Sequence, residues 1–236
     1  MKISKFTYDG PHGDRDLSFD MKAEIENETE HVIELVKTSC LMTNSDGVCV
    51  GGSYDNESDA YIEPRDTGSI DLGIGYMKAA PFGGQLDATK AVVDAVFFRR
   101  DFHKMGEVEI PESHEKCTFL EKVVNVGGSI DIMGATCIRH EADDDGDVTV
   151  ELQIGIRNLS DAYIDRVTTK IILLDQEDSQ IEDSEDYSSM PPHSGRIFTP
   201  SVYTKKGRLR NSTIRLSVSL YLPVGHQAEE AVAVKE

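Results

Sequence analysis

The residues best placed for chemistry include a short acidic run, "EADDDGDVT". It sets carboxylates around a glycine, at Asp143, Asp145 and Asp147. Closely spaced carboxylates in a tight loop are the oxygen ligands that Ca²⁺ prefers, although an EF-hand loop needs a different spacing and a glutamate at its twelfth position. The run therefore predicts either a calcium site on these three residues or a solvated hairpin turn, and we favour the turn.

A basic run, "KKGRLR", contrasts with the strongly acidic remainder of the chain. It contains Lys205, Lys206, Arg208 and Arg210, and Arg215 follows closely. The whole sequence has 43 acidic and 24 basic residues, with a net charge of −19. A basic area on an acidic protein suits the docking of an acidic loop from a neighbouring subunit. We therefore predict a protein-interaction patch, with nucleic-acid contact and a plain solvated turn as the alternatives.

The sequence contains no pattern typical of a catalytic site. Its seven histidines form neither H-x-H nor H-E-x-x-H, the usual arrangements for a metal enzyme. Its glycines form no phosphate-binding loop with a lysine, and no serine lies in G-x-S-x-G. We therefore expect a protein that is not an enzyme and that has no cofactor, apart from the calcium alternative.

The elements that position these residues follow from a repeat within the chain. "IENETEHVIELV" begins at Ile25 and "IRNLSDAYIDRV" begins at Ile156, an offset of 131 positions. In both copies the preceding segment alternates apolar and polar residues, as in "VTVELQIGI", which indicates a half-buried strand. A polar turn that starts at Asn27 or Asn158 follows, because such side chains bond the local backbone. A second strand comes next, and then an acidic, serine-rich segment that we expect to be a loop, "GSYDNESDAYIEP" or "EDSEDYSSMPP".

The end of each copy decides between strand and helix. "TKAVVDAVFF", from Thr89, has apolar residues at both helical and strand spacing. Its counterpart "STIRLSVSLYL", from Ser212, alternates strictly, and a helix would spread those apolar residues over both faces. We predict strands for both segments, with a helix in the first as the alternative.

The number of segments favours a β-sandwich. About seven strands per copy, separated by Gly, Pro, Asp and Asn, are typical of antiparallel sandwiches. We predict an all-β fold of two tandem antiparallel β-sandwich domains, immunoglobulin-like or jelly-roll-like, that arose by internal duplication. The expected boundaries are 1–112 for the first domain, 113–128 for a linker with a short helix, 129–225 for the second domain and 226–236 for a C-terminal tail.

The second copy resembles the bacterial immunoglobulin-like FxLYD domains at "GIRNLSDAYIDRVTTKIILLD". Conservative matches to the Gly-x-x-Asn-x-Ser pattern and to the strand motif are Gly155, Asn158, Ser160, Ile171, Leu173 and Asp175. Leu174 replaces the tyrosine of the motif, and "CLMTN" in the first copy departs from it altogether. The resemblance implies a non-catalytic module of a larger assembly or envelope protein, with no functional residues to carry over.

Charge and hydropathy bound the location and the partners. The apolar runs are far shorter than the roughly 20 residues that cross a bilayer, and the first residues lack the apolar region of a signal peptide. We expect a chain that is cytoplasmic as synthesised, without membrane insertion, and then incorporated into a particle or virion. An acidic surface repels nucleic acid, so we expect protein partners, in a homo-oligomer or a larger assembly.

The expected function is therefore that of a non-catalytic structural or assembly protein. The alternative is a ligand-binding module for Ca²⁺ or carbohydrate that uses the loops at one end of a sandwich. The four cysteines show no C-x-x-C pairing, and we expect them to be small apolar residues on strands.

Overall fold

The computed structural model describes residues 1–13, 16–78, 87–110 and 116–236. Most of these residues lie in β-strands, and helical geometry among them is confined to a single 3-10 turn, η1 (Lys206–Arg208). The predicted all-β fold is therefore confirmed. Within the described ranges, no helix is long and apolar enough to cross a membrane.

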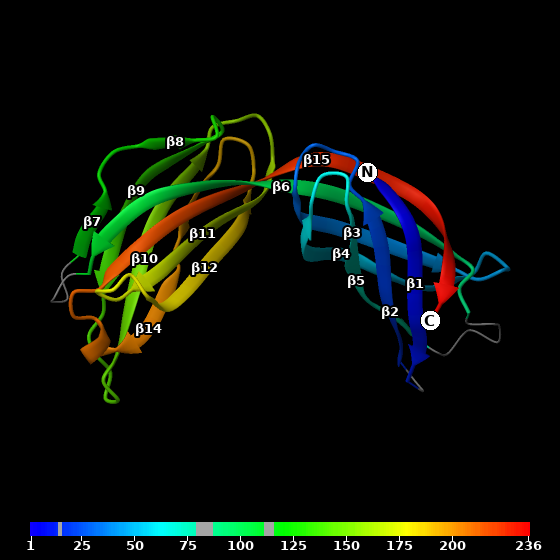
Figure 1. Ribbon diagram of the computed structural model, residues 1–236, viewed down its shortest axis with the longest axis horizontal. Coiled ribbons are helices and arrows are strands. Elements are labelled where there is room, and N and C mark those ends of the chain that lie inside the picture. Colours follow the sequence, from blue (N-terminus) through cyan, green and yellow to red (C-terminus); the bar gives the residue numbers. More distant parts are fainter. Residues whose placement is uncertain (14–15, 79–86, 111–115) are drawn as a thin grey trace. The chain divides into compact units, whose positions relative to one another are not determined.

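The chain forms two compact units (Figure 1). The first comprises residues 1–100 and 222–236, and the second comprises residues 101–221. Two long strands contribute to both units, namely β6 (Lys90–Glu109) and β15 (Thr213–Lys235). The segment predicted as strand or helix belongs to β6, so the strand prediction is confirmed.

The first unit also contains β1 (Lys2–His12), β2 (Asp16–Glu26), β3 (Ile33–Thr43), β4 (Cys49–Ile62) and β5 (Thr67–Lys78). The strands are ordered β4-β3-β6-β15-β1-β2-β5, and β1 pairs with β15 in parallel. Alternate side chains along these strands are buried in one apolar core, which includes Phe6, Phe19, Val36, Leu72 and Phe97. The two end strands of this order are linked through Asp71 of β5, whose carbonyl oxygen accepts hydrogen bonds from Ser58 (2.6 Å) and Asn56 (3.0 Å) of β4.

The second unit also contains β7 (Lys116–Leu120), β8 (Val124–Val126), β9 (Ile130–Arg139), β10 (Asp147–Asn158), β11 (Ile164–Leu174), β12 (Gln180–Met190), β13 (Gly195–Phe198) and β14 (Ser201–Lys205). One sheet has the order β13-β10-β9-β7, with β14 also on β10 and β8 also on β9. Elsewhere in the unit, β11 pairs with β12 on one side and with β15 on the other. Strict alternation in β10 buries Val148, Val150, Leu152, Ile154 and Ile156.

A buried asparagine holds the turn after β2 in the first unit. Asn27 is 1% exposed, and its Nδ2 donates to the carbonyl oxygens of His31 (2.7 Å), Ile62 (3.0 Å) and Glu63 (3.1 Å). Its Oδ1 accepts from the backbone N–H (3.0 Å) and the hydroxyl (2.7 Å) of Thr29. One side chain thereby joins the turn to the end of β4, which lies 35 residues further along the chain.

The second unit repeats this arrangement after β10. Asn158 is 0% exposed, and its Nδ2 donates to the carbonyl oxygens of Ala162 (2.9 Å), Met190 (3.2 Å) and Pro191 (3.0 Å). Its Oδ1 accepts from the backbone N–H (2.9 Å) and the hydroxyl (2.7 Å) of Ser160. The polar turns predicted at both positions are therefore present, and the same bonds hold both.

The structure differs from the sequence prediction in three segments. Where a linker with a short helix is predicted over 113–128, β7 and β8 pair with β9, so strands lie there in place of the helix. Residues 112 and 113, at the expected boundary, lie outside the described residues. The predicted tail 226–236 is almost wholly strand, because β15 continues to Lys235 beside β1. The predicted acidic loops belong to β4 and β12, whose polar side chains alternate between exposed and partly buried positions.

Replacement of either buried asparagine is expected to destabilise the protein to a similar degree. Asn27→Ala and Asn158→Ala each leave buried carbonyl oxygens without a donor, and such a loss costs about 1–3 kcal/mol per group. We expect each change to lower the free energy of unfolding in urea by about 3 kcal/mol. Asn125→Ala is the control, because Asn125 is exposed. An equal loss in the control variant would contradict the role assigned to the buried amides.

Candidate interaction surface

The predicted basic patch lies on a turn that leads from β14 to β15 in the second unit. Lys205 ends β14, Lys206 and Arg208 belong to η1, Arg210 lies in the following turn, and Arg215 is in β15. The structure thus keeps the first four residues together, as expected from their spacing, and displaces Arg215 onto a strand.

Apolar and backbone contacts hold this turn in place. The side chain of Leu209 is 4% exposed and anchors the turn in the core. The hydroxyl of Ser212 donates to the carbonyl oxygen of Arg208 (2.7 Å), and the backbone N–H of Lys206 donates to that of Gly146 (3.1 Å). With the leucine buried, the basic side chains on either side of it point to solvent.

Two of the five basic side chains are already paired. Lys205 Nζ lies 2.9 Å from a carboxylate oxygen of Asp147. Arg215 Nε lies 2.7 Å from the carboxylate of Glu107, which also accepts from Lys104 at 2.9 Å. These contacts with Lys104 and Arg215 lower the pKa of the Glu107 carboxyl below its ordinary value, the hydrogen bond from Lys104 having the larger effect.

The other three basic side chains are exposed and without an acidic partner. Within the described part of the chain, no carboxylate lies within 4 Å of Lys206, Arg208 or Arg210. Two of them border a hollow of about 310 Å³ that is also lined by Glu109 and Arg139. Such a hollow, with three cationic groups and one carboxylate, can accept an anionic side chain.

Arg139 is the residue of this site that the sequence analysis missed. It ends β9 and is 9% exposed. Along β9 it follows Ala135 and Cys137 on the buried side of the alternation. A charged residue at a core position of an alternating strand was the signal that could have pointed to it.

The three carboxylates of the predicted calcium alternative belong to the hairpin between β9 and β10. Asp143 Oδ1 accepts from the backbone N–H groups of Asp145 (3.0 Å) and Asp147 (2.8 Å). Asp147 also pairs with Lys205. Among the described residues, no group of three or more His, Cys, Asp or Glu side chains is arranged to hold a metal ion. The structure therefore brings these residues together in a turn.

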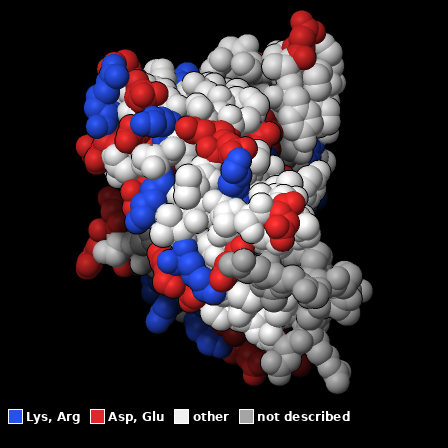
Figure 2. All heavy atoms as spheres, turned by 90° about the vertical axis from the view of Figure 1, so that its right-hand side faces the viewer, with Lys and Arg blue, Asp and Glu red and all other residues white. Residues whose placement is uncertain are grey.

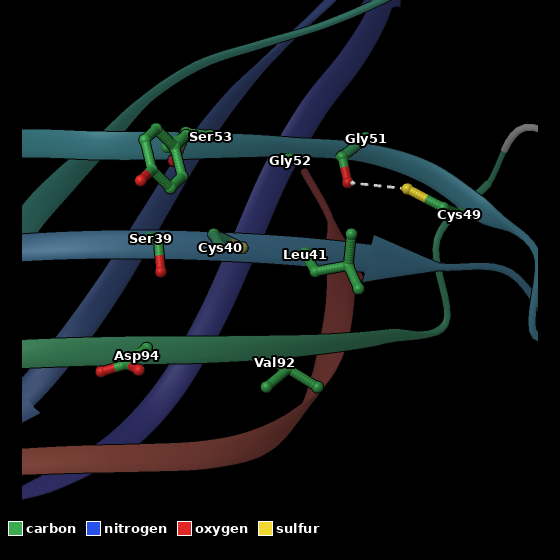
Figure 3. Close-up of a pocket in the computed structure, with 10 residues that line it drawn as sticks. Ser39, Cys40, Leu41, Cys49, Gly51, Gly52, Ser53, Val92 and Asp94 are labelled. Carbon is green, nitrogen blue, oxygen red and sulfur yellow. Dashed lines mark hydrogen bonds between the residues drawn. The ribbon is translucent and has the colours of Figure 1, made fainter.

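The first unit has a larger and more apolar hollow. It measures about 640 Å³ and lies across β4, β3 and β6, with Leu41 and Val92 side by side on neighbouring strands (Figure 3). Both side chains are nearly half exposed, and Tyr54 at its border is 90% exposed. The corresponding cross-strand pair in the second unit is Ile172 and Arg215. The two units thus present different surfaces on equivalent strands.

Outside the basic patch, acidic and basic side chains lie close to one another on the surface. Figure 2 shows one face of the molecule on which acidic and basic side chains are interspersed. In the first unit, Lys90 lies 2.7 Å from Glu230, and Lys235 lies 2.7 Å from Asp87, whose carboxylate raises the pKa of the lysine. Such exposed pairs contribute little to stability.

Comparisons with known proteins leave the function open. No family model and no curated protein matches the chain. Similar solved structures include "pT26-6p" (7% identity, TM-score 0.29, covering 98% of this chain and 62% of that chain), red sea bream transglutaminase (8%, 0.22, 100% and 31%) and infectious bursal disease virus Gx strain (8%, 0.27, 92% and 53%). The chain spans less than two thirds of the length of each. At these TM-scores the similarities carry no argument about function.

The Glu107 contacts predict a measurable change in titration. Lys104→Ala and Arg215→Ala each remove a cation that favours the carboxylate, so each should raise the pKa of Glu107 towards its ordinary value, the first by more. Because the folded pKa is lowered, these contacts stabilise the fold above the unfolded pKa, and the effect is lost as the pH falls through the folded value. A carboxyl-carbon NMR titration measures the shift. Arg208→Ala serves as the control, and an equal shift in that variant would contradict the assignment.

Proposed function

We propose that this chain is a non-catalytic structural protein of two tandem β-sandwich units, related by internal duplication, and that it is a subunit of a larger assembly such as a virion or another particle. The proposal includes self-association through the basic patch, with a second copy of the same chain as the partner. It also includes a relationship of the second unit to the FxLYD domains. Asn158 and Ser160, which match the sequence pattern of those domains, form the turn after β10.

Repeated geometry supports the duplication. β3 and β11 begin and end at the offset of 131 residues found in the sequence, and the two buried asparagines make matching bonds. A second equivalence links the last strands: Ala233 N–H donates to the carbonyl oxygen of Thr89, and Ile110 N–H donates to that of Ser212. Thr89 directly precedes β6 and accepts from the end of β15, whereas Ser212 directly precedes β15 and accepts from the residue after β6. The two repeats thus make equivalent backbone hydrogen bonds.

The observation that carries the assembly role is the basic patch. Lys206, Arg208 and Arg210 are exposed and lack acidic partners among the described residues, whereas the whole chain carries a net charge of −19. A small basic surface on an acidic protein is complementary to acidic surface on another copy. The basic side chains of this turn contribute nothing to the core, which only Leu209 enters from residues 205–210.

An edge strand of the same unit supplies a suitable acidic surface. β12 pairs with β11 and with no other strand in the described part of the chain, and Glu182 and Glu185 on it are exposed. Open strand edges are ready routes to association. Since the patch and this edge are different surfaces, a contact between them is head-to-tail, which generates rings or filaments.

Charge reversal tests this proposal. Lys206→Glu, Arg208→Glu and Arg210→Glu, combined in one variant, should raise the dissociation constant of self-association at least tenfold, equivalent to about 1.4 kcal/mol. Sedimentation velocity at low salt measures it. Association of the unaltered chain should also weaken as salt increases, because the screening length falls to about 10 Å at 0.1 M.

The matched control carries the same change of net charge elsewhere on the second unit. Lys116→Glu, Lys122→Glu and Arg157→Glu replace exposed basic residues outside the patch, and this variant should associate nearly as the unaltered chain does. A chain that stays monomeric at every salt concentration would refute the assembly role, and an equal effect of both variants would refute the patch.

The second candidate function is a ligand-binding module for carbohydrate, favoured by the hollow beside Tyr54. Exposed aromatic rings provide apolar faces with a polar tip, which suits the stacking of a sugar ring. Leu41 and Val92 add apolar surface on the neighbouring strands.

Binding of neutral oligosaccharides, followed by NMR of the full chain, tests this second candidate. Resonances of Leu41 and Val92 should shift on addition of the sugar, and Tyr54→Ala should abolish the shifts. Tyr203→Ala is the control, because Tyr203 is also exposed but lies on β14. Unchanged spectra over a panel of neutral oligosaccharides would exclude this candidate.

A further inference from the structure

Two cysteines face each other across a pair of strands in the second unit. Cys117 of β7 and Cys137 of β9 are register partners in an antiparallel pair. Both lie on the more buried side of the alternation: Cys137 is 0% exposed, and Cys117 is partly buried between the exposed Lys116 and Thr118. Side chains of directly opposed residues point to the same face of a sheet. Both thiols are free in the structure.

This register meets the Cα separation that a disulfide requires. Opposed residues in antiparallel strands have Cα atoms about 4.5–5.5 Å apart. A disulfide bridges Cα atoms about 4.4–6.8 Å apart. The register therefore places the two Cα atoms within the range that a disulfide bridges. The cysteines of the first unit are different, because Cys40 has Ser53 as its partner and Cys49 has Thr43.

We propose that Cys117 and Cys137 are an oxidisable dithiol, which forms an intramolecular disulfide by exchange with a low-molecular-weight disulfide such as oxidised glutathione. The cysteine pair is a modification site, and this proposal does not depend on the assembly role. Its structural consequence is a covalent link between β9 and β7, the end strand of its sheet.

The exposure of the two thiols sets the order of the steps. The thiolate of Cys117, the more accessible residue, attacks a sulfur of oxidised glutathione, and a mixed disulfide forms as one glutathione thiolate leaves and takes up a proton. The sulfur of Cys137, after losing its proton to water, then attacks the Cys117 sulfur and releases the second glutathione. In total, two protein thiols and one glutathione disulfide give one protein disulfide and two glutathione thiols.

Burial makes the second step the slower one. In the reduced protein, desolvation in the core and, to a smaller extent, the charge of Cys117 raise the pKa of the Cys137 thiol to about 12. Burial, the larger cause, still acts after Cys117 has become a mixed disulfide. Only the thiolate is nucleophilic, so at pH values below this pKa closure should become about tenfold faster for each unit by which the pH is raised. The mixed disulfide at Cys117 should therefore be detectable at neutral pH before closure.

Mass spectrometry of the full chain in oxidised glutathione tests the proposal. We expect a peptide pair joined through Cys117 and Cys137, with the loss of two hydrogen atoms, and its disappearance on reduction. Cys49, which is exposed and lacks a cysteine in register, is the internal control and should keep its glutathione adduct. Free thiols at both Cys117 and Cys137 while Cys49 is modified, or a bond from either to another cysteine, would overturn the proposal.

Two variants separate the steps. Cys137→Ala should accumulate the glutathione adduct at Cys117, because no second thiol displaces it. Cys117→Ala should leave Cys137 as a thiol over the same period. Modification of Cys137 at an undiminished rate in the second variant would overturn the assigned order. The measurement on the unaltered chain decides the proposal even if a variant fails to fold.

Discussion

A polar group that leaves water on folding needs a hydrogen-bond partner, and this requirement shapes both units. In each unit one asparagine amide supplies partners to several backbone groups at once. The carbonyl oxygens that it reaches near the ends of β4 and β12 lie 35 and 32 residues further along the chain. The turn after β2 or β10 is thereby tied to the strand that follows next but one. The alternating strands can then bury their apolar sides without leaving these backbone groups unpaired.

The surfaces of the units differ although this internal plan is shared. On equivalent strands, the first unit exposes Leu41 beside Val92, and the second has Ile172 beside Arg215. The basic turn of the second unit is anchored by the buried Leu209, so its charged side chains do not contribute to core packing. Core positions repeat because the same backbone must be packed twice, whereas exposed positions can diverge at little cost in stability. Any difference in binding between the units therefore lies in these exposed residues.

Much of the fold was predictable, and the errors have a common cause. Alternation identified β10 and, through its counterpart in β15, the strand nature of β6, since a side-chain period of two is a local property. The linker prediction failed because β7 and β8 find backbone partners on β9, which the spacing of their own residues does not reveal. The tail prediction failed for the same reason, since β1 lies beside the last part of β15. Of the site, the exposed basic residues were found from their spacing, but Arg139 was not, because its neighbours in the hollow come from a distant segment.

The order of residues along the chain determined the strand type, the repeat and the position of the two asparagine turns, because alternation, matching segments and turn-forming residues can each be recognised in the linear sequence. Folding in three dimensions decided which strands became partners, and with them the hollow around Arg139, the contact of Arg215 with Glu107 and the register of Cys117 with Cys137. The physical reason is that backbone hydrogen bonds form equally well between any two extended segments, whatever their side chains. Their choice of partner is settled by the burial of whole faces and not by local preference.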